Sequence, residues 1–126
     1  MRTSLNEPEA GAVPQVAPLM MLDRLADGGF AEVEVILDGD AESLLLYRHG
    51  DEVRAWLNIC PHAGRRLDWA PGQFLKNRDG LLVCAAHGAS FELIRGECVA
   101  GPCRGDALRA VSVSVRDGAV WLEGGE

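Results

Sequence analysis

The sequence predicts an all-β, antiparallel fold, because short apolar segments with a period of two alternate with glycine-containing turns. Residues 30–37 alternate apolar side chains with small or charged ones, as expected of a half-buried strand. Near the C-terminus, valine and serine alternate in residues 111–115, and the turn Arg116-Asp117-Gly118 completes a hairpin signal. The predicted strands are 30–37, 43–48, 53–59, 74–75, 81–83, 110–115 and 119–122.

Residues 1–28 are expected to form an N-terminal extension, and residues 29–126 the folded domain. Several prolines with small residues between them favour an extended arm over a helix in the extension. The apolar patch 19–22 is expected to lie across the domain or against a neighbouring subunit. In the last hairpin, Val111, Val113 and Val115 are predicted to face the core.

Length and composition limit the possible architectures and partners. A chain of 126 residues, 48% of them hydrophobic, is long enough for one core but hardly for two. Its net charge of −7 disfavours nucleic acid and anionic membranes as partners and favours basic protein surfaces. No apolar run reaches the roughly 18 residues needed to span a bilayer, and no secretory signal is recognisable, so a cytoplasmic location is expected.

Two short motifs each combine one cysteine with one histidine. Cys60 and His62 are separated by one residue, and Cys84 and His87 by two. Brought face to face, these side chains would make a Cys2His2 metal site. Structural zinc is the alternative to iron and sulfur, but zinc sites commonly pair cysteine with cysteine and histidine with histidine, whereas each motif here mixes the two types.

The two motifs are embedded in a longer pattern that resembles the Rieske [2Fe-2S] domain in its ferredoxin-like form. The residues of the pattern are Cys60, His62, Leu67, Cys84, His87, Gly88, Phe91, Gly96, Gly101 and Pro102. The resemblance implies a Rieske-type antiparallel β-sandwich with a small inserted cluster-binding subdomain at about 57–105. It also implies one [2Fe-2S] cluster, with Cys60 and Cys84 on one iron and His62 and His87 on the other.

The same resemblance bears on the reduction potential of the cluster. High-potential members carry an additional cysteine pair that forms a disulfide, and hydroxyl groups that donate hydrogen bonds to sulfur. The corresponding positions here are Arg65 and Ala86 for the cysteines, and Ala89 and Phe91 for the hydroxyl groups. Without those donors the reduced cluster is less stabilised, so a potential in the lower part of the family range is predicted.

Several other polar residues near the motifs have no assigned role. Cys98 and Cys103 are kept out of the ligand set and are expected to be reduced, partly buried thiols, with a local disulfide or a regulatory thiol as alternatives. His49 is expected to be a solvated residue in a turn. Arg65 and Arg66 are interpreted either as solvated surface residues or as a basic rim for docking.

The predicted function is electron transfer without catalysis. The resemblance points to a ferredoxin that connects a flavin reductase to a terminal oxygenase, or to the small subunit of a nitrite reductase. A complete oxygenase would also need a mononuclear iron with two histidines and a carboxylate in a separate domain, and the motifs use two of the three histidines present. A redox-sensing module using Cys98 and Cys103, or an accessory subunit of a larger oxidoreductase, is the alternative.

Overall fold

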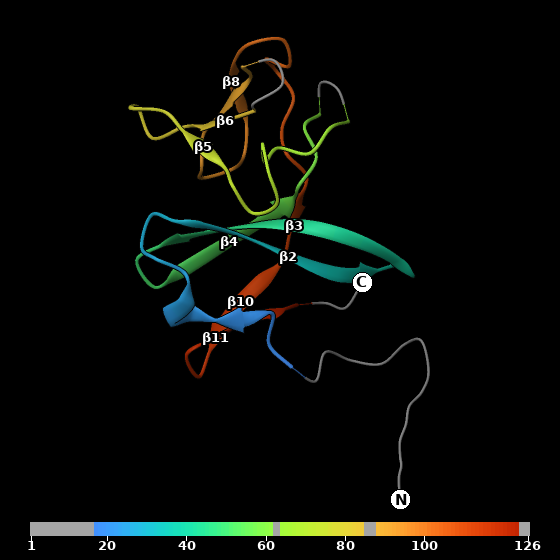
Figure 1. Ribbon diagram of the computed structural model, residues 1–126, viewed down its shortest axis with the longest axis vertical. Helices are drawn as coiled ribbons and strands as arrows, with labels where there is room; N and C mark the ends of the chain where they lie inside the picture. The colour runs from blue at the N-terminus through green and yellow to red at the C-terminus, as the bar shows by residue number, and fades with distance from the viewer. Residues whose placement is uncertain (1–16, 62–63, 85–87, 124–126) are drawn as a thin grey trace, which may run out of the picture.

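The computed structural model describes residues 17–61, 64–84 and 88–123, and this part of the chain consists of antiparallel strands without an α-helix (Figure 1). One turn of 3-10 helix, η1, spans Leu22–Arg24. The strands are β1 (Met20–Met21), β2 (Phe30–Leu37), β3 (Asp40–His49), β4 (Glu52–Leu57), β5 (Leu75–Lys76), β6 (Leu82–Val83), β7 (Ser90–Phe91), β8 (Cys98–Ala100), β9 (Ala110–Val111), β10 (Val113–Arg116) and β11 (Ala119–Leu122).

The strands form three layers in the described part of the chain. The middle sheet has the order β2-β3-β4-β9, and β1-β11-β10 forms the sheet on one side of it. The third sheet, β5-β6-β7-β8, lies on the other side of the middle layer (Figure 1). The chain leaves the middle sheet after β4 and returns to it at β9, so the third sheet is an insertion. The predicted sandwich with an inserted subdomain is confirmed.

Strand β3 is buried on both faces. Leu44, Leu45 and Leu46 are 0% exposed, and Tyr47 is also buried. Because successive side chains of a strand point to opposite faces, Leu45 and Tyr47 pack in the core of the insert, while Leu44 and Leu46 pack toward the three-stranded sheet. This explains four consecutive apolar residues in a strand that would otherwise alternate.

In the N-terminal half the predicted strands 30–37 and 43–48 agree with the structure, whereas the strand predicted for 53–59 is observed at 52–57 and ends two residues earlier than predicted. Strand β2 has the predicted bounds, and β3 extends beyond the predicted 43–48 at both ends. The turn between them has positive φ angles at Asp38 (52°) and Gly39 (86°), as a two-residue hairpin turn of the primed type requires. His49, at the end of β3, is exposed as predicted.

The single strand predicted for residues 110–115 is wrong, because it is divided at Ser112. Strand β9 pairs with β4 in the middle sheet, whereas β10 pairs with β11 in the three-stranded sheet. The alternation of valine and serine continues through Ser112, so nothing in the local pattern marks this change of sheet. The three valines of the segment still pack against the core, as predicted.

Part of the predicted extension contributes to the fold. Strand β1 pairs with β11, and Leu25 is 2% exposed in the core between the middle and three-stranded sheets. The prolines at 8 and 14 lie outside the described residues. In the part of the chain that the structure describes, no helix is long and apolar enough to cross a membrane.

Replacing Leu45 by alanine should destabilise the domain by about 2–5 kcal/mol, because it leaves a cavity between the middle sheet and the insert. Urea unfolding followed by circular dichroism measures this free energy. Ile36→Ala, on the same sheet but 63% exposed, is the control and should change it by less than about 0.5 kcal/mol. Equal effects of the two substitutions would contradict the packing described for β3.

Candidate metal centre

The two cysteines of the predicted ligand set lie in one buried cluster of the insert. Cys60 follows β4, Cys84 follows β6 directly, and both are 0% exposed. His62 and His87 lie outside the described residues. Within the described ranges, no three His, Cys, Asp or Glu side chains gather as a metal site, so the geometry bears on the cysteine half of the predicted set.

The two motif loops are closed by the same backbone hydrogen bonds. In each loop the cysteine N–H donates to the carbonyl five residues later, and the N–H of the glycine four residues later donates back to the cysteine carbonyl. The bonds are Cys60 N to Arg65 O (2.6 Å), Gly64 N to Cys60 O (2.8 Å), Cys84 N to Ala89 O (2.8 Å) and Gly88 N to Cys84 O (2.9 Å). Both glycines have positive φ, which suits a residue without Cβ. The two loops therefore have the same backbone hydrogen-bond pattern, although the number of residues between cysteine and histidine in the sequence differs.

The loop after β8 packs against the second motif. A Cβ atom on Gly101 would lie 2.8 Å from Cα of Ala89, and the φ of Gly101 is +96°. The predicted apolar cover is also present, because Leu67 and Phe91 are both 0% exposed in the core of the insert. The described parts of the two motif loops lie at the end of the molecule far from β10 and β11, as does the loop after β8 (Figure 1).

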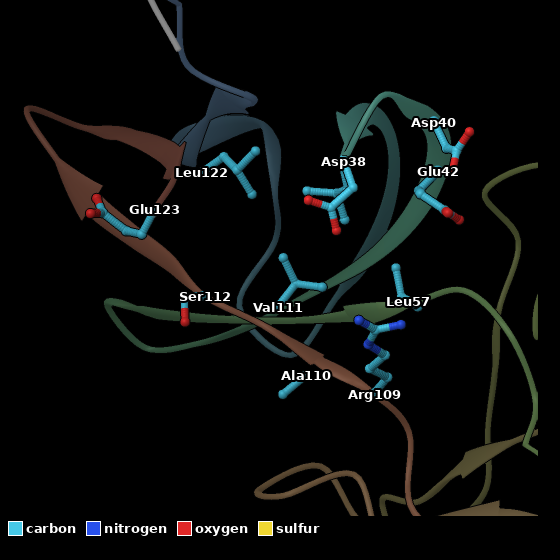
Figure 2. Close-up of a pocket in the computed structure, with 11 residues that line it drawn as sticks. Asp38, Asp40, Glu42, Leu57, Arg109, Ala110, Val111, Ser112, Leu122 and Glu123 are labelled. Atoms are coloured by element: carbon cyan, nitrogen blue, oxygen red, sulfur yellow. The ribbon is translucent and has the colours of Figure 1, made fainter. Parts of the chain in front are cut away.

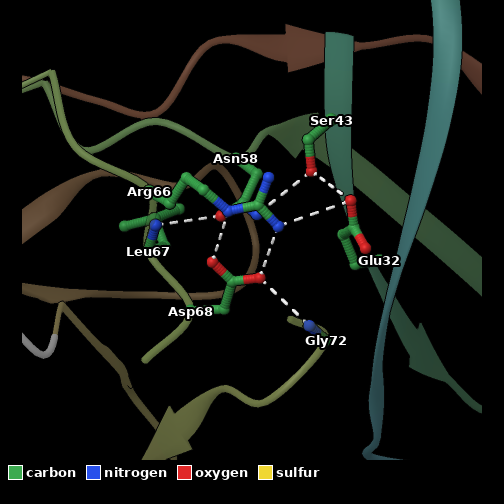
Figure 3. A network of polar contacts seen from close by, with 7 residues as sticks. All are labelled: Glu32, Ser43, Asn58, Arg66, Leu67, Asp68 and Gly72. Atoms are coloured by element: carbon green, nitrogen blue, oxygen red, sulfur yellow. Dashed lines mark hydrogen bonds and ion pairs between the residues drawn. The ribbon is translucent and has the colours of Figure 1, made fainter. Parts of the chain in front are cut away.

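A buried asparagine connects the first motif to the middle sheet (Figure 3). Asn58 is 1% exposed, and its Oδ1 accepts a hydrogen bond from the Leu67 N–H at 2.9 Å. Its Nδ2 donates to Ser43 Oγ at 3.1 Å, and that hydroxyl donates to Glu32 at 2.7 Å. Both ends of the first motif loop are thereby fixed to strands β2 and β3, which are distant in sequence.

An ion pair completes this network (Figure 3). Arg66 donates two hydrogen bonds to Asp68, at 2.9 and 2.8 Å, and lies 3.4 Å from Glu32. The Gly72 N–H also donates to Asp68, whose side chain is only 1% exposed. Burial of Asp68 opposes its charge, but the bonds from Arg66 and Gly72 and the nearby Asn58 outweigh this effect and hold its pKa below 3.8. Asp68 in turn raises the pKa of Arg66.

This network distinguishes Arg66 from Arg65, the two arginines that were interpreted either as solvated surface residues or as a basic rim for docking. Both side chains are exposed, but Arg66 is held by ion pairs with Asp68 and Glu32. The supporting roles of Asn58 and Asp68 were not predicted from the sequence. The sequence contained one signal for Asn58, a polar residue at the end of an apolar strand and directly before a metal motif. Burying a side-chain amide there without a hydrogen-bond partner would cost free energy of folding.

The family profile of the Rieske [2Fe-2S] domain matches residues 15–114. The chain belongs to the Rieske [2Fe-2S] domain family. A comparison with curated protein sequences found no match. Such a domain carries one [2Fe-2S] cluster, which supplies a one-electron redox couple when bound.

Solved structures of Rieske proteins resemble this domain over most of its length. The ferredoxin of carbazole 1,9a-dioxygenase from Nocardioides aromaticivorans IC177 is 26% identical with a TM-score of 0.64, and the match covers 84% of this chain and 94% of that chain. The terminal oxygenase of the same system is 28% identical with a TM-score of 0.65, covering 86% of this chain but 30% of that one. The Sphingomonas yanoikuyae B1 ferredoxin, at 24% identity and a TM-score of 0.59, shares the fold, with 84% and 95% covered.

The residues of this Rieske domain fit the cluster that its family carries. Cys60 and Cys84 provide two buried sulfur atoms, at equivalent positions of two loops with the same backbone bonds. Thiolate is the ligand that iron–sulfur clusters require. At the two positions where hydroxyl donors were considered, Ala89 and Phe91 are 0% exposed and have none, while Ser90 donates to the Gly88 carbonyl at 3.4 Å.

The described part of the domain also contains a pocket of about 570 Å³ (Figure 2). It is lined by the β2–β3 turn, the end of β4, the segment around β9 and the end of β11. Its polar side chains include Asp38, Asp40, Glu42 and Glu123, with Arg109 as the basic group. Neither Cys60 nor Cys84 lines this pocket, so it is separate from the described half of the proposed metal centre.

The depressed pKa of Asp68 predicts an acid-sensitive contribution to the stability of the Rieske domain. A carboxyl group with a lowered folded-state pKa stabilises the fold above about pH 4 and loses this contribution as pH falls through the folded value. Asp68→Asn should therefore lower the unfolding free energy by about 1–3 kcal/mol at pH 7, and the deficit should shrink below pH 4. Urea unfolding at pH 7, 4 and 3 measures it, with Asp79→Asn in the exposed 77–80 turn as the control. A deficit independent of pH would contradict the network.

Gly101→Ala should destabilise the domain by about 1–3 kcal/mol and lower its cluster content, because the new Cβ meets the Ala89 backbone. Gly105 is the matched control, since its φ of +100° imposes the same backbone strain but its Cβ would meet nothing within 4 Å. Iron content per chain and the thermal midpoint compare the two variants. If Gly105→Ala is as damaging as Gly101→Ala, backbone strain rather than loop packing explains the glycine.

Proposed function

We propose that Cys60 and Cys84 bind one iron of the cluster and that His62 and His87 bind the other. The burial of both cysteines and the matching loop bonds support this assignment. The neutral imidazoles leave the second iron with less negative charge than thiolates would, which favours acceptance of an electron. The proposed domain is 29–126, with the cluster-binding part at about 57–105, and β1 and Leu25 of the preceding extension pack on this domain.

This chain is the electron-carrying ferredoxin of a multicomponent oxygenase system and has no catalytic activity of its own. The observation that carries the proposal is the match to a dioxygenase ferredoxin across 94% of that protein's length, against 30% of the terminal oxygenase. A carrier needs the cluster domain alone, whereas oxygenation needs a second iron centre in a larger chain.

The electron donor proposed is a flavin reductase, and the acceptor is the Rieske centre of a terminal oxygenase. The end of the molecule that carries the motif loops also presents Arg65 and Trp69 as exposed side chains, and Trp69 is 59% exposed. A net charge of −7 on the whole chain would steer it toward basic surfaces on these partners. Single electrons would pass through the imidazole side of the cluster.

The ligand assignment predicts a different result for each class of histidine. His62→Ala and His87→Ala should each abolish the rhombic electron paramagnetic resonance signal of the dithionite-reduced protein, because the mixed nitrogen and sulfur ligation is lost. His49→Ala, at the exposed end of β3, should leave the signal unchanged and is the control. Purified protein that contains zinc and no iron would contradict the proposal.

Electron transfer is tested with the partners themselves. The reduced wild-type protein is mixed anaerobically with an oxidised terminal oxygenase of the carbazole dioxygenase type, and reoxidation of the carrier is followed by absorbance. Transfer to the oxygenase, and reduction of the carrier by NADH with a flavin reductase, are the expected results. A reduced cluster that transfers no electron to any oxygenase tested, while its spectrum is intact, would contradict the carrier role alone.

A further inference from the structure

Two cysteines that the metal centre does not use are in contact. Cys98 lies at the start of β8 and Cys103 in the loop that follows, with exposed fractions of 5% and 2%. The thiol of Cys103 donates to Cys98 Sγ at an S–S distance of 2.9 Å. The Cys98 thiol donates to the carbonyl of Ala100 at 3.3 Å, which leaves its sulfur as the acceptor toward Cys103.

Backbone hydrogen bonds to Asp106 hold the two cysteines near each other. The Cys98 N–H donates to Asp106 O at 2.8 Å, and the Asp106 N–H donates to Cys103 O at 2.8 Å. A disulfide requires the two sulfur atoms at about 2.05 Å, with their Cα atoms held at short separation. Because both residues are held to Asp106, the loop needs little rearrangement to bring the sulfur atoms within bonding distance.

Cys103 also contacts the proposed ligand Cys60. Burial, together with the Cys98 and Cys60 side chains hydrogen-bonded to it, raises the pKa of the Cys103 thiol to about 12. The Cys103 thiol has one S–H, which it donates to Cys98 in this structure. When Cys60 is an iron-bound thiolate, its negative sulfur is a stronger acceptor for that hydrogen than the neutral Cys98.

We propose that Cys98 and Cys103 form a reversible disulfide that withdraws the Cys103 S–H from Cys60 and lowers the reduction potential of the cluster. The effect on the potential rests on the proposed ligand role of Cys60, whereas disulfide formation does not. A hydrogen bond to a ligand sulfur stabilises the reduced, more negative cluster. The disulfide has no hydrogen to donate, so the cluster becomes harder to reduce.

The oxidant is a low-molecular-weight disulfide such as oxidised glutathione. The Cys98 thiolate attacks one glutathione sulfur, the glutathione S–S bond breaks, and one glutathione thiol leaves with a proton. Cys103 then attacks the sulfur of Cys98 in the mixed disulfide and loses its proton, and the second glutathione thiol leaves. The two cysteines lose two electrons, which reduce one glutathione disulfide to two thiols. Exposed residues Pro102 and Arg104 flank Cys103, so opening of this surface loop admits the oxidant.

The first test detects the disulfide in the cluster-loaded protein. The protein is equilibrated anaerobically in glutathione buffers of increasing oxidised fraction, unfolded in acid, alkylated and digested with trypsin. Residues 96–104 form one tryptic peptide with both thiols, whereas the proposed ligand cysteines lie in separate peptides, 55–65 and 79–95. The expected result is a 96–104 peptide without alkyl groups in oxidising buffer and with two in reducing buffer, while the other two peptides are alkylated in both. A 96–104 peptide that carries two alkyl groups in every buffer would overturn the proposal.

The second test measures the midpoint potential of the cluster in the two thiol states. Oxidation of the pair should lower the equilibrium constant for one-electron reduction about tenfold, which corresponds to about 59 mV. Cys98→Ala keeps the Cys103 donor and should have the higher potential in either buffer. Cys103→Ala should have the lower potential in either buffer, and Cys103→Ser should restore the higher value because a hydroxyl group replaces the thiol as donor.

The results separate this inference from the electron-carrier proposal. A disulfide that forms without any change in potential would overturn the coupling to Cys60, even if the carrier reduces an oxygenase normally. The coupling would also be overturned if the potentials of the three variants did not depend on whether residue 103 can donate a hydrogen bond. Loss of the rhombic resonance signal in Cys98→Ala would instead contradict the assignment of the cluster ligands.

Discussion

The burial of β3 on both faces is the constraint on which the rest of the structure depends. Leu44 and Leu46 hold the three-stranded sheet on one side, and Leu45 and Tyr47 hold the insert on the other. Each layer thus covers an apolar face that would otherwise be in water. Because β4 is the neighbour of β3 and ends at Leu57, the first motif loop begins near the end of an interior strand of this middle sheet. The metal centre is placed by the core of the domain rather than by its own loops alone.

The insert has little regular structure of its own, since β5, β6 and β7 each contain two residues. Its order comes from the shared core and from polar contacts to the middle sheet. Asn58 is the most buried of these contacts, and its amide joins the Leu67 N–H to the Ser43 hydroxyl. The network also neutralises charge, because Arg66 lies between Asp68 and Glu32. A polar support of this kind fixes the position of a loop more narrowly than apolar packing, which tolerates sliding.

Sequence patterns predicted those features of the fold that depend on neighbours along the chain. The alternation in residues 30–37 and the Asp-Gly turn that follows were sufficient for the first hairpin. The division at Ser112 was not predictable, because the same alternation continues on both sides while the pairing partner changes. The network around Asn58 depends on Ser43 and Glu32, which lie 15 and more residues away, so the local pattern indicated a side chain that needs a partner but not which residues provide it. The motif spacing predicted Cys60 and Cys84 as ligands, and the structure places both in one buried cluster, but the spacing could not decide whether Cys98 and Cys103 meet.

The contact between those thiols changes the interpretation of the missing hydroxyl donors. A thiol is a weaker hydrogen-bond donor than a hydroxyl group. A donor at Cys103 is therefore compatible with a potential in the lower part of the family range. A hydroxyl group, however, is a donor in every redox environment, whereas a thiol next to a second thiol loses its hydrogen when a disulfide forms. A cluster whose ligand sulfur is hydrogen-bonded by Cys103 thus acquires a potential that depends on the thiol balance of its surroundings. In such a carrier, oxidising conditions make electron acceptance from the reductase less favourable.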